Sequence, residues 1–200
     1  MLGKLLHKTK PDPELNQRIE TERFHLIPCN QRQAIKITLG WANDPEILRN
    51  LMHSKDHYSP LEWVGQVGKP DNYNLFYHAI LAKENGLTIG ANRVRIDEHG
   101  TANNSFVLHS KKWRGKGVLK EVRPLAMDFF AKSDRVHRFY ARILAHNVAA
   151  IKSCERIGFR KIGVDTGAAI NPTTGEYQDT VHFEFLKSDW IAMRKKKSRD

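Results

Sequence analysis

The segment spanning residues 101–144 constrains the fold most, because it alternates extended and helical patterns around a short basic loop. Residues 101–109 are predicted to form a strand, which ends just before the basic loop at 111–116. Apolar residues then recur at helical spacing over 118–131, giving one face that can pack on a sheet. Residues 136–144 are predicted to be a strand again. This order indicates a sheet with helices packed on its faces.

The remaining elements complete a mixed α/β pattern. Two strands, at 75–83 and 87–96, flank the turn Glu84-Asn85-Gly86, and an Asn-Gly step between strands favours a tight hairpin. Asp44 and Pro45 have the residue types of an N-cap and a first helical position. Further strands are predicted over 22–29 (as an edge strand) and 181–186, and further helices over 44–52, 61–67 and 147–157.

The composition is typical of one globular domain. The chain has 200 residues, of which 40% are hydrophobic and 28% charged, so it can bury a core of its own. No apolar stretch approaches the ~18 residues that span a bilayer, so we expect no membrane partner. Cys29 and Cys154 lie far apart without CxxC spacing, which predicts neither a metal site nor a disulfide framework, and a reducing cytoplasm is the simplest expected compartment.

The net charge of +11 favours anionic partners, such as nucleic acid, the ribosome or a polyphosphate cofactor. Part of this excess is terminal, in residues 194–199, where a solvated tail is the simpler interpretation. We therefore expect three regions: a polar, loosely attached extension over 1–20, a domain over 21–190, and a basic tail over 191–200.

The loop before the central helix has the residues of a phosphate site. Gly115 and Gly117 allow the backbone to curl, so that successive N–H groups point into one concavity. The N-terminus of the following helix adds unpaired donors and a positive dipole end. Arg114 and Lys116 add full charges. Together these features predict a pyrophosphate site, although a basic surface turn would have the same sequence.

A second segment, NVAAIKSCERIGF at 147–159, identifies the family. Asn147 is a candidate N-cap and Gly158 fits a left-handed C-terminal position. The spacing from Asn147 to Cys154 and to Gly158-Phe159 resembles the second conserved block of the GNAT acetyltransferase superfamily. Arg114-x-x-Gly117 resembles its first block, the pyrophosphate loop. The segments 21–28, 117–121 and 185–190 resemble the branch that acetylates the N-termini of ribosomal proteins, so the likeness covers about residues 21–190.

This resemblance implies an N-acetyltransferase with acetyl-CoA as co-substrate. The implied fold is a central mixed, mostly antiparallel sheet flanked by helices, with a V-shaped split between two parallel strands. Acetyl-CoA would lie in the split, and an amine would attack the thioester directly. The implied contacts are Val107, Leu108 and His109 along the pantetheine arm, Arg114, Gly115, Lys116, Gly117, Val118 and Leu119 around the pyrophosphate, and Asn147 at the pantetheine or the thioester.

The chemistry requires a proton acceptor for the ammonium and a proton donor for the leaving thiolate. Cys154 stands where relatives often carry a tyrosine donor, and a thiol could replace it, although free cysteines are often core residues. Arg142 stands where some relatives carry a glutamate base, and arginine is no base. The remaining candidates for the base are Asp97, Glu98, His109 and Glu121, or a water chain to one of them. Glu121 also suits the helix dipole, and His109 has a suitable ordinary pKa.

Several functions stay open from the sequence. The acceptor could be a protein N-terminus or a small amine. A cationic amine would require acidic side chains, which Asp44, Glu46, Asp56 and Glu62 could supply. The absence of a tyrosine donor and a glutamate base also allows a catalytically silent acyl-CoA-binding module, and the basic surface allows an RNA- or ribosome-associated protein. The chain is expected to be a monomer or a homodimer.

Overall fold

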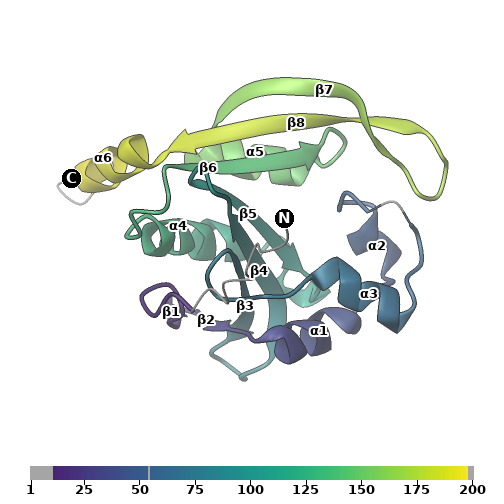
Figure 1. Cartoon of the computed structure of the whole chain (residues 1–200), viewed down its shortest axis with the longest axis horizontal. Helices are drawn as coiled ribbons and strands as arrows, with labels where there is room; N and C mark the ends of the chain where they lie inside the picture. The colour runs from purple at the N-terminus through teal and green to yellow at the C-terminus, as the bar shows by residue number, and fades with distance from the viewer. Residues whose placement is uncertain (1–10, 54, 198–200) are drawn as a thin grey trace, which may run out of the picture.

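The computed structural model describes residues 11–53 and 55–197, which build an eight-stranded sheet with helices on both faces (Figure 1). The strand order is β1-β2-β3-β4-β5-β6-β8-β7, and every neighbouring pair is antiparallel except β5 and β6. The expected mixed, mostly antiparallel α/β fold is therefore confirmed. The strands are β1 (Ile19–Glu20), β2 (Phe24–Pro28), β3 (Leu75–Ala82), β4 (Thr88–Ile96), β5 (Thr101–Leu108), β6 (Arg138–Leu144), β7 (Arg160–Ile170) and β8 (Tyr177–Leu186).

The sheet splits at its parallel pair. β5 and β6 are paired only over Thr101–Asn103 and Arg138–Tyr140, after which the two strands diverge. β5 continues to Leu108 along β4, whereas β6 continues to Leu144 along β8. This divergence is the V-shaped opening that the family resemblance implied.

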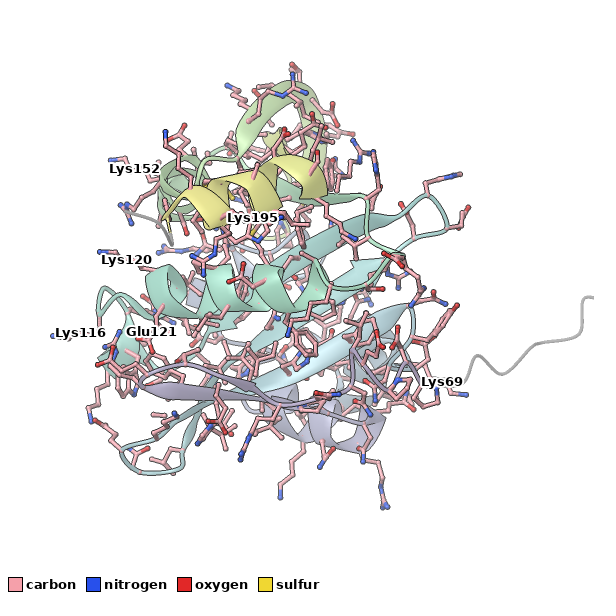
Figure 2. All side chains as sticks on the ribbon, turned by 90° about the vertical axis from the view of Figure 1, so that its left-hand side faces the viewer. Lys69, Lys116, Lys120, Glu121, Lys152 and Lys195 are labelled. Carbon is pink, nitrogen blue, oxygen red and sulfur yellow. The ribbon has the colours of Figure 1, made fainter. Side chains whose placement is uncertain are left out.

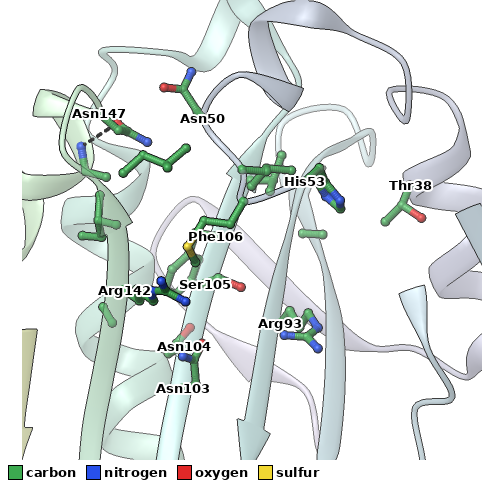
Figure 3. A pocket seen from close by; sticks show the side chains of 18 of the residues that line it. Thr38, Asn50, His53, Arg93, Asn103, Asn104, Ser105, Phe106, Arg142 and Asn147 are labelled. Carbon is green, nitrogen blue, oxygen red and sulfur yellow. Dashed lines mark hydrogen bonds between the residues drawn. The ribbon is translucent and has the colours of Figure 1, made fainter. Parts of the chain in front are cut away.

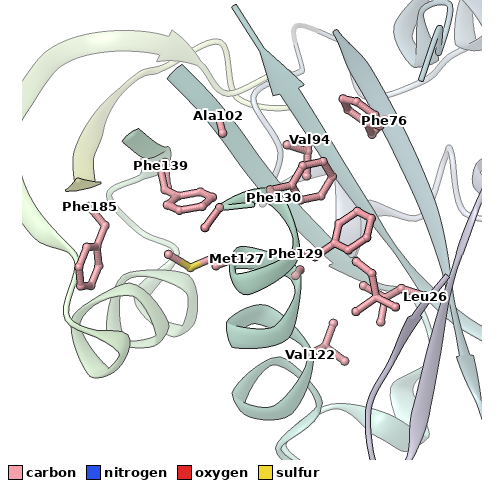
Figure 4. Packing of buried hydrophobic residues seen from close by; sticks show 14 of the residues in the cluster. Leu26, Phe76, Val94, Ala102, Val122, Met127, Phe129, Phe130, Phe139 and Phe185 are labelled. Atoms are coloured by element: carbon pink, nitrogen blue, oxygen red, sulfur yellow. The ribbon is translucent and has the colours of Figure 1, made fainter. Parts of the chain in front are cut away.

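One face of the sheet is covered by α4 (Val118–Phe130), with α5 (Val148–Ile157) and α6 (Lys187–Lys197) beside it. The apolar stripe of α4 packs on the strands as its spacing predicts (Figure 4). Phe130 is fully buried, and its ring lies 5.2 Å from Phe76 and 5.3 Å from Phe129. Burying several large aromatic side chains contributes most of the stability of such a face.

The opposite face is covered by α1 (Gln31–Leu39), α2 (Pro45–Leu48) and α3 (Pro60–Val67) around a second apolar cluster that includes Trp41 and Trp63. The sequence analysis missed α1, which begins with a capping box between Asn30 and Gln33. The helix predicted over 44–52 is wrong beyond Leu48. Asp44 does cap it, but the chain then leaves the helical path and continues as an irregular segment along the opening.

Both predicted terminal segments are attached more firmly than expected. Leu15 and Ile19 are buried in the core, and β1 pairs with β2, so the strand at 22–29 is not the edge strand. Residues 191–197 continue α6, where Arg194 pairs with Asp128 at 2.6 Å. The rest of these two segments, 1–10 and 198–200, lies outside the described residues. Within the described part of the chain, no helix is long and apolar enough to cross a membrane.

Candidate functional site

A cavity of about 360 Å³ lies where β5 and β6 diverge (Figure 3). Strands β4, β5 and β6 supply its floor and one wall, the first turn of α5 supplies an edge, and α1, α3 and the segment after α2 cover it. Its polar and charged lining residues are Thr38, Asn50, His53, Gln66, Arg93, Asn103, Asn104, Ser105, Arg123, Arg142 and Asn147.

The charged side chains of this lining are all arginines. Arg93 comes from β4, Arg123 from α4 and Arg142 from β6. No aspartate or glutamate of the described residues lines the cavity. The acidic pocket considered for cationic amines is therefore not formed by its four candidates. Asp44 and Glu62 cap helices, Glu46 pairs with Arg114 and Lys111, and Asp56 is exposed.

His53 is the lining residue whose ordinary pKa lies closest to neutrality. Burial lowers its pKa, so the imidazole is neutral at pH 7 and can accept a proton. Its Nδ1 lies 3.3 Å from the Tyr58 hydroxyl, and its ring lies 5.4 Å from the Trp63 ring centre. The sequence analysis did not single out His53, because it lies in an irregular segment without a motif.

Cys154 reaches the cavity through Arg123. The thiol is fully buried on α5 and does not line the cavity itself. The Arg123 guanidinium donates to Cys154 Sγ at 3.2 Å and lies 5.1 Å from the Phe106 ring centre. Burial raises the pKa of Cys154 despite this positive neighbour, so the thiol is protonated at pH 7 and retains an S–H to donate.

The glycine-rich loop has the backbone that a pyrophosphate site needs. Gly115 and Gly117 have φ of 73° and 75°, a left-handed conformation that glycine adopts without strain. The N–H groups of Gly117, Val118 and Leu119 have no acceptor among the described residues. The loop lies at the open end of the split, since Arg114 Nε donates to the carbonyl of Leu108 at 3.3 Å.

Glu121 holds the N-terminal part of the chain against α4. Partial burial alone would raise its pKa, but hydrogen bonds from Thr21 and Arg23 lower it. Its Oε1 accepts from Thr21 Oγ1 at 2.6 Å and from the Arg23 N–H at 2.7 Å, and Oε2 accepts from Arg23 Nε at 2.7 Å. Arg23 also donates to the carbonyl of Lys116 at 3.2 Å, which fixes the loop. Glu121 does not line the cavity.

The three residues predicted along the pantetheine arm face different ways. The His109 N–H donates to the Ile89 carbonyl of β4 at 3.1 Å, so this N–H points away from the opening and is not available to the pantetheine arm. Backbone groups alternate along an antiparallel strand, so Leu108 turns its own toward the opening. The side chain of Val107 lines the cavity, whereas the His109 ring stacks on Trp41 outside it. Burial lowers the pKa of His109.

Asn147 caps α5 as predicted, because its Oδ1 accepts from the Ala150 N–H at 3.1 Å, and it also lines the cavity. Asp97 and Glu98 lie elsewhere. The carboxylate of Asp97 accepts from the N–H groups of His99 and Thr101, and Glu98 is exposed. Of the site residues predicted from sequence, the structure thus brings Val107 and Asn147 to the cavity and Cys154 next to it.

The sequence matches the family model described as an acetyltransferase (GNAT) domain over residues 23–160. Among curated proteins, it is similar to the ribosomal protein uS5-alanine N-acetyltransferase of Escherichia coli. The identity is 22% over 185 residues, covering 88% of this chain and 94% of that protein. The corresponding protein of Shigella flexneri matches equally well.

Solved structures share the fold. The spermidine N-acetyltransferase of Vibrio cholerae, in complex with CoA and spermine, has a TM-score of 0.72 at 18% identity, covering 84% of this chain and 98% of that one. RimL, a ribosomal L7/L12 alpha-N-protein acetyltransferase with CoA in a disulfide to one of its cysteines, has a TM-score of 0.73 at 15% identity, covering 86% and 99%. At these identities the likeness concerns the fold alone.

Proposed function

The chain belongs to the acetyltransferase (GNAT) family, and from that premise we propose that it acetylates the α-amine of a protein N-terminus by direct attack on acetyl-CoA. It is thus an enzyme, an acetyltransferase with acetyl-CoA as its co-substrate. We favour a protein N-terminus over a polyamine because no carboxylate lies in the described lining of the cavity. A polyamine would bring several positive charges into a cavity lined by arginines, whereas a peptide brings one amine that must become neutral before it reacts.

The residues around the split fit acetyl-CoA. The free N–H groups at the start of α4 would bind the pyrophosphate, with Arg114 and Lys116 nearby. Lys116, Lys120 and Lys152 project from the same edge of the molecule, where they can neutralise further phosphate charge (Figure 2). The backbone of Leu108 would pair with the pantetheine arm, and Asn147 would contact it near the thioester. When bound, acetyl-CoA supplies the thioester carbonyl that the amine attacks.

In the proposed mechanism the bound ammonium first loses one proton to solvent, the neutral amine attacks the thioester, and His53 takes the second proton from the nitrogen as the N–C bond forms. His109 and Glu121 are less suitable bases, because the His109 ring stacks on Trp41 and the Glu121 carboxylate is held by Thr21 and Arg23. The positive charges of Arg93 and Arg142 also disfavour the ammonium form of a bound amine, so they help to produce the nucleophile.

Cys154 would donate its proton to the departing thiolate as the new N–C bond forms and the C–S bond breaks. The Arg123 guanidinium would then stabilise the Cys154 thiolate until it regains a proton.

The test is a transfer assay with acetyl-CoA and a library of peptides, each with a free or a blocked N-terminus. We expect CoA release and acetylated product with free N-termini and neither with blocked ones. Spermidine and spermine serve as the competing acceptors. Acetylation of the polyamines but of no peptide would overturn the proposal. CoA binding without transfer to any amine would instead indicate a silent acyl-CoA-binding module.

A further inference from the structure

The arginines of this protein fall into two groups according to their partners. Outside the cavity, each arginine that is not exposed has a carboxylate oxygen within 4 Å. These pairs are Arg114–Glu46 at 2.9 Å, Arg135–Asp12 at 3.9 Å, Arg138–Glu184 at 3.2 Å and Arg194–Asp128 at 2.6 Å. In the cavity, Arg142 has the Asp165 carboxylate at 3.9 Å, but Arg93 and Arg123 have no carboxylate within 4 Å among residues 11–53 and 55–197.

Arg123 contacts Cys154 and the face of Phe106, and Arg93 contacts Tyr77, so neither guanidinium has an anionic partner among the described residues. Arg93 is half-buried in the middle of β4, with its guanidinium 6.0 Å from the Tyr77 ring centre. A guanidinium cannot lose its proton at physiological pH, so burial cannot be relieved by neutralisation. Partial burial of such a charge is costly unless an anion or water faces it.

The register places Arg93 on the cavity face of the sheet. Arg93 is opposite Tyr77 on β3 and Ser105 on β5, and these side chains share the face covered by α1 and α3. Arg142 lies across the split on β6, held by Thr180 Oγ1 at 3.1 Å and the Ala168 carbonyl at 3.2 Å. Figure 3 shows Arg93 and Arg142 on either side of Ser105.

The phosphates of CoA do not account for Arg93. Their proposed site is the loop at the start of α4, and none of the residues 115–119 lines the cavity. Arg114 lies at that loop but is neutralised by Glu46. A planar guanidinium facing a cavity matches a carboxylate, which it can bind through two parallel hydrogen bonds.

We propose that the acceptor carries a carboxylate close to its reactive amine and that Arg93 binds it. Resting on the proposed function, this means an N-terminus with aspartate or glutamate within its first few residues. Arg93 is then a specificity-determining residue, and Arg142 supports the same anion from across the split. The cavity selects an acidic segment and excludes polyamines through the same charges.

The test uses pairs of peptides that differ only by Asp or Asn at the second or third residue. We expect the wild-type enzyme to favour the acidic peptide by about tenfold in kcat/KM, equivalent to ~1.4 kcal/mol. Arg93→Gln should bring that ratio close to one, mainly through KM, while CoA binding stays unchanged. Arg95→Gln is the matched control, because Arg95 lies two residues along the same strand, is exposed and does not line the cavity.

A second pair of acceptors, free aspartate and its diamide, separates this inference from the function on which it rests. If no peptide reacts but aspartate is acetylated in preference to its diamide, and Arg93→Gln removes the preference, the peptide function fails and the carboxylate site stands. If neither acidic acceptor is favoured over its uncharged analogue, or if Arg93→Gln keeps the preference, the carboxylate site is wrong.

Discussion

The two faces of β3 and β4 bury polar groups in opposite ways. On the α4 face, His78 and Asn92 are paired in register and fully buried, and their side-chain nitrogens and oxygens have no partner in the described part of the chain. Burial lowers the pKa of His78 to about 4, so it stays neutral. One residue along, on the cavity face, Arg93 stays charged. A neutral group can remain buried at a modest cost, whereas a permanent charge points to a ligand.

The largest effect is expected on the α4 face. Phe130→Ala should lower the free energy of unfolding by about 3–5 kcal/mol, because a fully buried aromatic ring leaves a cavity between Phe76 and Phe129. KM for the acceptor should not change in the folded fraction. Urea unfolding measures the loss, and Leu61→Ala, at an exposed side chain, is the control. A loss below ~1 kcal/mol would contradict the described packing.

His78 should make the same face sensitive to acid. The unfolded chain binds a proton at His78 below its ordinary pKa of 6.5, whereas the folded chain resists protonation until about pH 4. Stability is therefore lost as the pH falls from 6.5 to 4, by roughly 3 kcal/mol from this residue. His78→Leu should remove that part of the loss.

The measurement for His78 is urea unfolding at several pH values, compared between the variant and the wild type. His99→Gln, at an exposed histidine, should keep the wild-type pH dependence. Identical profiles for His78→Leu and the wild type would mean that His78 is hydrated or protonated in the folded state.

On the cavity face the effects should appear in the rate. His53→Gln should lower kcat by roughly 10²-fold, typical of a lost general base, without lowering the melting temperature by more than a few degrees. Because burial lowers the pKa of His53, the wild-type rate should fall only as the pH drops below 6.5. His57→Gln, at an exposed histidine of the same segment, should leave kcat unchanged. A kcat within threefold of the wild type would exclude His53 as the base.

Cys154 packs in the core on the α4 face and contacts Arg123 of the cavity lining, so it tests whether this face takes part in the chemistry. Cys154→Ala should lower kcat by roughly 10²-fold if the thiol protonates the leaving thiolate. Cys154→Ala should also lower the free energy of unfolding by about 1 kcal/mol. Cys29→Ala, at the other buried free cysteine, should show a similar loss of stability with an unchanged kcat. Unchanged kcat at saturating acetyl-CoA would reduce Cys154 to a packing residue.

The smallest effect is expected at the loop. Gly117→Val should weaken CoA binding by about tenfold or more, ~1.4 kcal/mol, because a β-branched residue does not adopt the left-handed conformation that Gly117 has. Calorimetry measures the affinity. Gly86→Val imposes the same backbone strain at a glycine with a φ of 70° in the β3–β4 turn, with open space around it. Equal CoA affinities for Gly117→Val and Gly86→Val would mean that the CoA phosphates do not bind at the loop before α4.

Elements that depend only on neighbouring residues could be predicted from the sequence. The Asn-Gly hairpin, the amphipathic stripe of α4 and the two caps of α5 all depend on neighbouring residues, and the structure confirms them. Helix α1 was missed although Asn30 and Gln33 form a capping box, since Ile35, Ile37 and Leu39 alternate with polar residues in a pattern typical of a strand. β7 gave no alternating pattern because most of its residues are exposed on both faces.

The cavity could be predicted only in part. Arg114, Gly117 and Asn147 belong to motifs with fixed spacing, so sequence alone could nominate them. His53, Arg93 and Arg123 come from three elements that meet only after folding, and none of them belongs to a motif. Sequence alone could not show that Arg23 pairs with Glu121 or that the His109 ring stacks on Trp41, because these contacts form only in the folded chain.

The order of the last strands has a consequence for how the protein is made. β2 to β5 each pair with the strand that precedes them in the chain, so this half of the sheet can assemble as the polypeptide leaves the ribosome. β8 instead lies between β6 and β7, and β7 has no other partner among the described strands. β7 can therefore join the sheet only after residues 177–186 have been synthesised and have formed β8. A nascent chain lacking them would expose the free edge of β6 and the whole of β7, so the cavity wall is complete only after residues 177–186 have been made.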